Sequence, residues 1–196
     1  MSKVSLPPGD GFDVAGLEAV ATADNVGAPV KQFAVQIRDV VFGERCALVQ
    51  PCNLYECRLG DDVFVGPFSE IQAGVVIGNR TRVQSHTFVC SLVTIGDDCF
   101  IGHGVKFIND AFSDMRVAFA DEAHKWEATT LGNNVLIGTN ATIMPVNICD
   151  NAVIGAGSVV TSDITEPGFY MGVPAVRIGD PPPDDKRRKA IDTDDH

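Results

Sequence analysis

Six polar residues in the middle of the chain have side chains that suit proton transfer and the binding of a polar small molecule. They are Glu70, Gln84, His86, His103, Asn109 and Asp110. Histidine changes its charge near neutral pH, so His86 and His103 can take up or release a proton. Such residues, gathered on a rigid scaffold, would form a small-molecule site. The alternative is that they are solvated positions on a regular surface.

The element that must position these residues is a six-residue repeat. From Leu59 to Phe107, and again from Leu131 and Ile148, each block opens with a branched aliphatic residue and often continues with glycine. Its fifth residue is small. Six residues are too few for an amphipathic helical repeat, but they fit one short strand and a sharp corner. Three strands would close a triangular turn of about eighteen residues, and the turns would stack into a solenoid.

Residues eighteen apart should therefore lie above one another. With Glu70, the two histidines His86 and His103 would lie on neighbouring turns on one side of the prism. The next block ends in the run FIND, which brings Asn109 and Asp110 to the root of a long segment without the repeat. We therefore expect one polar cluster beside this segment.

The repeat divides the chain into three parts. Residues 1–35 form an N-terminal extension, in which the segment that starts at Asp13 suggests a short helix. Residues 36–170 form the β-helix domain of roughly six turns. Residues 171–196 form a C-terminal segment with a polar tail, which we expect to be solvated or to pack as a helix on the solenoid.

Three irregularities interrupt the repeat. Two blocks, Leu54 to Leu59 and Ile143 to Ile148, run one residue short, and we interpret them as tightened corners. The third is a loop at residues 109–130. A long excursion from a regular stack is more often functional than accidental, although a passive surface loop is the alternative.

Composition excludes several classes of protein. The formal net charge is −11 and the sequence pI is about 4.6, which argues against DNA or RNA as a partner. No apolar stretch is long enough to span a membrane, and the N-terminus lacks a signal core, so we expect a cytoplasmic protein. None of the six cysteines forms a Cys-x-x-Cys pair, so we expect small, buried, reduced thiols.

The hexapeptides are similar to those of hexapeptide-repeat proteins, which form a left-handed parallel β-helix. Four segments carry a narrower resemblance. They are Glu70–Gln72 (EIQ), Val83–Cys90 (VQSHTFVC), Ile101–Asp110 (IGHGVKFIND), and VIGAGSVVTSDI with the following GVPA. They resemble nucleotide-sugar N-acetyltransferases, in particular the WbpD and QdtC types that acetylate the 3-amino group of UDP- or dTDP-linked amino sugars. Trp126, just before the repeat resumes, belongs to the same pattern.

The resemblance implies a homotrimer with each site between adjacent subunits, and acetyl-CoA as the co-substrate without a metal. The pantetheine would contact small residues on the C-terminal turns, namely Gly138, Thr139, Ala156 and Gly157, where the ligand can approach the backbone closely. Arg177 would contact the CoA phosphates, or else is a surface charge.

The resemblance also implies the roles of the polar residues. Asn109 would be the central active-site residue, orienting the amine or stabilising the developing oxyanion. His86, with Glu70 nearby, is the candidate for handling the proton, unless the amine loses it directly to the CoA thiolate. The sugar would be bound by Gln84, His103, Asp110, Arg116 and Trp126. The related enzymes carry a Pro-Arg pair after the FIND run; here Asp114 and Arg116 occupy that neighbourhood.

Three other functions use this fold. An O-acetyltransferase would act on a hydroxyl and would need a stronger base, because a hydroxyl is the poorer nucleophile. A zinc enzyme resembling γ-type carbonic anhydrases would need three histidines, for which His86, His103 and His124 are available. A non-catalytic β-helix subunit would need no CoA groove.

Overall fold

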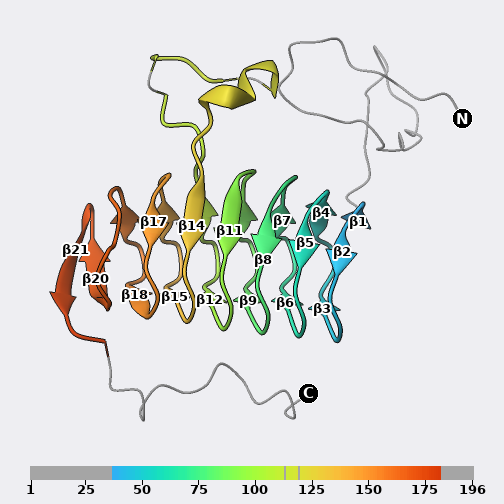
Figure 1. The fold of residues 1–196 in the computed structure, drawn as a ribbon, viewed down its shortest axis with the longest axis horizontal. Coiled ribbons are helices and arrows are strands. Elements are labelled where there is room, and N and C mark those ends of the chain that lie inside the picture. Colours follow the sequence, from blue (N-terminus) through green and yellow to red (C-terminus); the bar gives the residue numbers. More distant parts are fainter. Residues whose placement is uncertain (1–36, 113, 119, 182–196) are drawn as a thin grey trace, which may run out of the picture.

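The chain forms a triangular prism of short parallel strands. A computed structural model describes residues 37–112, 114–118 and 120–181. Figure 1 shows the turns stacked side by side along the long axis, with a loop standing out from one edge beside β14. Each turn contributes one strand to each of three sheets, so the fold is all-β as the repeat predicts.

The three sheets contain strands that recur every third element. The first sheet has the order β1 (Ile37–Arg38), β4 (Asn53–Tyr55), β7 (Glu70–Ile71), β10 (Phe88–Val89), β13 (Lys106–Phe107), β16 (Thr142–Ile143) and β19 (Val159–Val160). The second has the order β17 (Asn147–Ile148), β14 (Thr129–Leu131), β11 (Val93–Ile95), β8 (Val76–Ile77), β5 (Arg58–Leu59) and β2 (Val41–Phe42). The third has the order β21 (Ala175–Gly179), β20 (Gly168–Gly172), β18 (Ala152–Ile154), β15 (Leu136–Ile137), β12 (Phe100–Ile101), β9 (Arg82–Val83), β6 (Phe64–Val65) and β3 (Ala47–Leu48).

The edges of the prism are named here by the order of the chain. The first corner joins the first sheet to the second, the second corner joins the second sheet to the third, and the third corner leads from the third sheet to the first sheet of the next turn. The loop leaves the first corner between β13 and β14 and contains a short 3-10 helix, η1 (Ala120–Lys125).

Register is preserved through every irregularity of the sequence. Ile95 pairs with Leu131 across the whole loop, and Leu54 pairs with Ile71 across a shortened turn. The second shortened block behaves in the same way, since Leu131 pairs with Ile148. The shortened blocks are therefore tightened corners, as predicted.

The aliphatic residues that open the blocks fill the prism. Their exposed fractions are 3% or less from Leu54 to Ile154, and Phe107 is fully buried among them. Burial of each such side chain stabilises the fold by roughly 1.5–3 kcal/mol before entropy is counted. Because every turn places an aliphatic side chain at the same interior position, the stacked turns share one continuous hydrophobic core.

The C-terminal end differs from the prediction. The first sheet contains seven strands, which gives seven turns rather than about six. The segment after Val160 completes the last turn although its repeat is degenerate: Ile164 bridges Ile148, and β20 pairs with β18. β21 then folds back antiparallel on β20 and ends the stack as a hairpin. The helix suggested at Asp13 and the polar tail lie outside the described residues.

Candidate functional site

The loop is held at its root by Asn109 and Asp110. The Asn109 carbonyl accepts the amide N–H of Glu127 at 2.8 Å, which closes the loop onto its own start. The two carboxylate oxygens of Asp110 accept the amide N–H groups of Phe112, at 2.9 Å, and Ala118, at 2.7 Å. Asp110, expected from the resemblance to bind substrate, thus has both oxygens engaged in shaping the loop.

A chain of hydrogen bonds joins Asn109 to Glu70 along the first corner. The Asn109 Nδ2 donates to the Ser91 carbonyl at 3.3 Å, and the Ser91 amide donates to Gln72 Oε1, also at 3.3 Å. Gln72 Nε2 in turn donates to Glu70 Oε1 at 2.9 Å. All four residues are half-buried. This arrangement fixes one side of the Asn109 amide. No group in residues 37–112, 114–118 and 120–181 donates to its Oδ1, which is therefore available to a ligand.

The rest of the loop is organised by ion pairs. Glu122 accepts hydrogen bonds from Arg116 and Lys125, both at 2.8 Å, and Lys125 also pairs with Asp114 at 2.9 Å. The Arg116 hydrogen bonds, followed by the one from Lys125, lower the pKa of Glu122 to about 2. Trp126 donates its indole N–H to the Ala118 carbonyl at 3.3 Å. Arg116 and Trp126, both predicted to bind substrate, therefore also build the loop.

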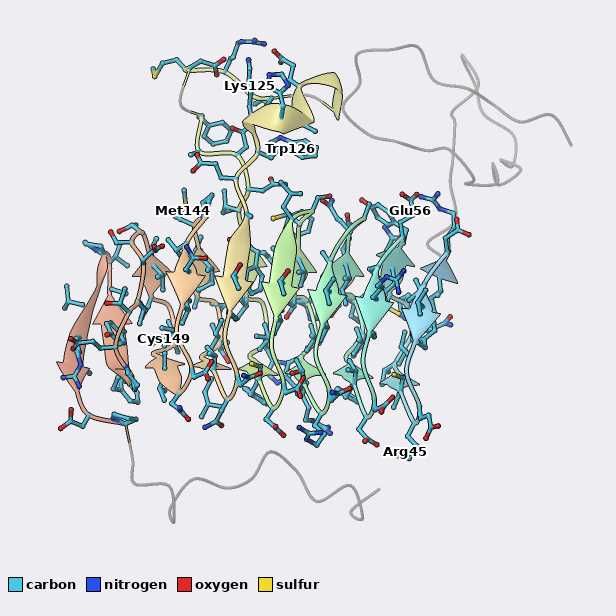
Figure 2. All side chains as sticks on the ribbon, in the orientation of Figure 1. Arg45, Glu56, Lys125, Trp126, Met144 and Cys149 are labelled. Atoms are coloured by element: carbon cyan, nitrogen blue, oxygen red, sulfur yellow. The ribbon has the colours of Figure 1, made fainter. Side chains whose placement is uncertain are left out.

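Lys125 and Trp126 stand well away from the prism in Figure 2. Glu56 and Met144 lie on the edge from which the loop rises, and Arg45 lies on the opposite side of the view. The loop and its root are thus features of the first corner.

The two histidines of the cluster lie at the third corner. Ser85 Oγ and His103 Nδ1 are 2.8 Å apart on successive turns. The rings of Phe68 and His86 are likewise stacked, with centroids 5.0 Å apart and planes inclined by 34°. Lys106 Nζ donates to the His86 carbonyl. Gln84 is half-buried at the same corner, so the eighteen-residue stacking predicted for this edge is confirmed.

The predicted polar cluster is divided between two edges. Asn109 follows His103 by six residues, and one hexapeptide carries the chain from one corner to the next. The first sheet therefore lies between the His86–His103 edge and the Asn109 edge within one chain. Glu70, which we expected beside His86, is hydrogen-bonded to Gln72 instead.

The second corner is closed by its side chains. The amide of Asp61 donates to Asn79 Oδ1 of the next turn at 2.8 Å, and the amide of Asn79 donates to Asp97 Oδ1 at 2.8 Å. The ladder continues from Asp97 to Asn133, at 2.9 Å. Each turn thereby satisfies the exposed N–H group of the turn before it.

The third corner has no such ladder. The equivalent positions hold Ser85, His103, Thr139 and Ala156, and their amide N–H groups donate to no other group within residues 37–112, 114–118 and 120–181. Gly138 packs so closely on the next turn that an added Cβ would lie 2.5 Å from the Ala156 nitrogen, while Gly157 faces open space. The C-terminal part of this corner, from Gly138 to Gly157, is a column of small residues and free donors, and it contains all four predicted pantetheine contacts. The signal for this difference is in the sequence: Asp or Asn recurs at this position of the second corner, as in Asp61, Asn79 and Asp97, but not of the third.

Arg177 lies on β21 in the terminal hairpin. It pairs with Asp180 and donates to the Pro167 carbonyl at 3.2 Å. The guanidinium is exposed, so a CoA phosphate would have to share it with Asp180.

The structure gives no support to a three-histidine metal site. His124 lies in η1 above the first corner, whereas His86 and His103 lie at the third corner. Among the described residues, no three His, Cys, Asp or Glu side chains are grouped to hold a metal ion.

All six cysteines are free thiols, and burial raises the pKa of Cys57 and Cys90 to about 12. No helix in the described part of the chain is long and apolar enough to cross a membrane.

Two family models match the repeat. Residues 56–91 match the bacterial transferase hexapeptide (six repeats), and residues 92–105 and 128–162 match the hexapeptide repeat of succinyl-transferase. The gap between the last two matches coincides with the loop. These matches confirm the left-handed parallel β-helix that the resemblance to hexapeptide-repeat proteins implies.

Curated relatives match about two thirds of this chain. The bifunctional protein GlmU of Clostridium acetobutylicum is 31% identical over 139 residues, which cover 67% of this chain and 30% of that protein. GlmU of Thermotoga petrophila is 26% identical over 159 residues, or 69% of this chain and 35% of that protein. The chain thus spans about a third of the length of these relatives.

Solved structures show the same fold. A hexapeptide transferase family protein from Anaplasma phagocytophilum has a TM-score of 0.58 and 20% identity, with 71% of this chain and 77% of that chain covered. A perosamine N-acetyltransferase variant from Caulobacter crescentus, solved with CoA and GDP-perosamine, has a TM-score of 0.53 and 24% identity. That match covers 72% of this chain and 58% of the other.

Proposed function

Because its repeats match the models of hexapeptide-repeat transferases, we propose that this chain is an acyltransferase that moves an acetyl group from acetyl-CoA to the amino group of a nucleotide-linked sugar. The observation that carries the proposal is the open third corner. Its free amide N–H groups at Thr139 and Ala156 suit the carbonyl oxygens of an extended pantetheine arm, and the small residues let that arm approach the backbone.

The choice of acceptor rests on two observations. The Caulobacter crescentus protein of the same fold was solved with CoA and a nucleotide-linked sugar. In this chain the polar loop beside Asn109 provides hydrogen-bonding groups for such a substrate. The narrower resemblance favours an amine at C3 of a UDP- or dTDP-linked sugar. The loop residues Asp114 and Arg116 replace the usual Pro-Arg pair and would set which sugar is accepted.

The division of the site between two edges requires a second copy. The proposed thioester column lies at the third corner, whereas Asn109 lies at the first corner across the first sheet. A homotrimer resolves this geometry if the first corner of one subunit faces the third corner of its neighbour, because a cyclic assembly repeats that contact three times. Each site would then combine Asn109 and the loop of one chain with His86 and the pantetheine column of the next.

The proposed reaction is a direct attack of the neutral amine on the thioester carbonyl carbon. The Asn109 Oδ1, whose amide is fixed by Ser91, accepts a hydrogen bond from the amine and orients its lone pair. The tetrahedral intermediate then expels the CoA thiolate. The proton released from the nitrogen passes to His86 or directly to that thiolate, so the products are the acetamido sugar and free CoA.

Turnover against a panel of acceptors tests this function. Full-length protein is incubated with acetyl-CoA and UDP-, dTDP- or GDP-linked amino sugars, and free CoA and the acetylated sugar are measured. The matching hydroxy sugars serve as controls. Acetylation of an amino sugar supports the proposal. Faster acetylation of the hydroxy sugars, or no CoA release with any acceptor, would contradict it.

A further inference from the structure

Phe68 is an unusual residue for its place in the fold. The fourth residue of each block at the third corner takes a positive φ, which is 60° at Phe68, 63° at His86, 70° at Gly104, 58° at Asn140 and 68° at Gly157. Glycine and asparagine adopt this conformation readily, although Arg45, Arg80 and Leu92 also take it at the other corners. The Phe68 side chain is also 59% exposed. Neither backbone preference nor burial explains a phenylalanine at this position.

The Phe68 ring is one half of an aromatic pair. It lies against the His86 ring, with centroids 5.0 Å apart and planes tilted by 34°, so the two rings together form an aromatic platform at the edge of the prism. Aromatic platforms of this kind bind flat π systems such as nucleobases.

A cation without an acidic partner lies beside the platform. Lys106 Nζ donates to the His86 carbonyl, and no carboxylate within the described residues pairs with it. Lys125, the other described lysine, is paired with both Asp114 and Glu122. Burial lowers the pKa of Lys106 because its charge is partly desolvated. In a chain with a net charge of −11, an unpaired, partly desolvated cation suits an anionic ligand.

We propose that Phe68, His86 and Lys106 form a binding site for a nucleoside diphosphate, with the base stacked on Phe68 and the diphosphate beside Lys106. This inference rests on the proposed function, because it places the nucleotide end of the sugar substrate. CoA also ends in a nucleoside diphosphate. The position of the platform favours the sugar, since Phe68 lies on the far side of Ser85 and His103 from Thr139 and Ala156.

The platform can be removed without disturbing the backbone. Phe68→Asn introduces the residue that occupies the same φ at Asn140, so this variant should fold at least as well as the wild type. Phe68→Trp restores an aromatic surface. Phe64→Ala is the matched control, because it truncates a phenylalanine of the same turn that lies on the third sheet against Arg82.

Calorimetric titration of the full-length protein with UDP, dTDP, GDP and CoA tests the proposal. The wild type should bind at least one of the three diphosphates. Phe68→Asn should weaken that binding roughly tenfold or more, with CoA affinity unchanged. Phe68→Trp and Phe64→Ala should bind as the wild type does. Lys106→Met should weaken binding of the diphosphate but not of the matching nucleoside.

Three results would overturn the site. The first is equal diphosphate binding by Phe68→Asn and the wild type. The second is a loss of CoA affinity in Phe68→Asn, which would assign the platform to the co-substrate. The third is a wild type that binds none of the diphosphates. The acceptor panel tests the proposed function separately. If amino sugars are acetylated but Phe68→Asn does not change diphosphate binding, acetyl transfer is supported and the nucleotide site is not.

Discussion

Replacing Asn109 with alanine should abolish most of the activity and leave the fold nearly unchanged. Within the described residues the side chain makes one hydrogen bond, from Nδ2 to the Ser91 carbonyl, which is long at 3.3 Å, and Asn109 is only half-buried. Such a bond stabilises the folded state by about 0.5–1.5 kcal/mol at most. A loss of about 1 kcal/mol would lower the Tm of a chain of this size by roughly 2–4 °C.

The expected effect on the reaction is larger. Losing the group that orients the amine, Asn109 Oδ1, should lower kcat by a factor of about 100, which corresponds to about 2.7 kcal/mol. A purely structural role for Asn109 cannot produce this loss, because the bond to Ser91 is too weak. The two roles therefore predict different ratios of lost activity to lost stability.

The assay measures CoA release at saturating acetyl-CoA and amino sugar, alongside thermal unfolding. Asn147→Ala is the matched control. Asn147 lies on the second sheet, and its Nδ2 also donates a 3.3 Å hydrogen bond, in this case to the exposed Asp163. Its kcat should stay within twofold of the wild type. A kcat of Asn109→Ala within threefold of the wild type would refute the placement of the site at the first corner.

Three further predictions concern the loop, the thiols and the core. The pKa of Glu122 is depressed to about 2, so its ion pairs stabilise the loop fully above about pH 4.5 and are lost as the pH falls toward 2; the fluorescence of Trp126, the one tryptophan, should stay constant down to pH 4.5 and change below it, and a change at pH 6 would contradict this. Burial raises the pKa of Cys57 and Cys90 to about 12, so neither should react with a thiol reagent at pH 8 until the chain unfolds, and rapid labelling of either in the native protein would be inconsistent with the fold. Phe107→Ala should reduce the free energy of unfolding by about 3–5 kcal/mol in denaturant titrations, whereas a loss below 1 kcal/mol would mean that the prism interior is not close-packed.

The fold could be predicted because each six-residue block has the same pattern of buried and exposed positions. An aliphatic residue at the first position and a small residue at the fifth leave one solution for a six-residue period, and even the two shortened blocks kept their register. The number of turns was underestimated because the segment from Val160 to Gly172 pairs through its backbone without the repeat. The hairpin of β20 and β21 likewise depends on antiparallel pairing, which carries no six-residue signal.

The site was predicted less completely. The repeat shows which residues stack on successive turns, but which edges of the prism two residues occupy has to be worked out separately. The eighteen-residue period placed Ser85 under His103 and Phe68 under His86. It did not place Asn109 beside them, since a difference of six residues moves a side chain to another edge. The Glu70–Gln72–Ser91–Asn109 chain of hydrogen bonds requires side-chain conformations that no repeat encodes.

The loop is the least predictable part. Its sequence has no period, and its shape depends on Asp110 binding two backbone N–H groups and on the pairing of Arg116 with Glu122. An aspartate before an irregular segment does suggest a hydrogen bond to a backbone N–H group two residues on, as Asp110 makes to Phe112. Its second partner, the Ala118 N–H group eight residues on, is set only by the folded loop.

Mixed assemblies test most directly whether the site is built from two chains. Asn109→Ala removes the first-corner group, and Ala156→Trp fills the third-corner column at an exposed position. Each variant alone should be nearly inactive. Co-assembled in equal amounts as trimers, they should recover about a quarter of wild-type turnover, because one site in four pairs two intact edges. No recovery in verified mixed trimers would contradict a site shared between neighbouring subunits.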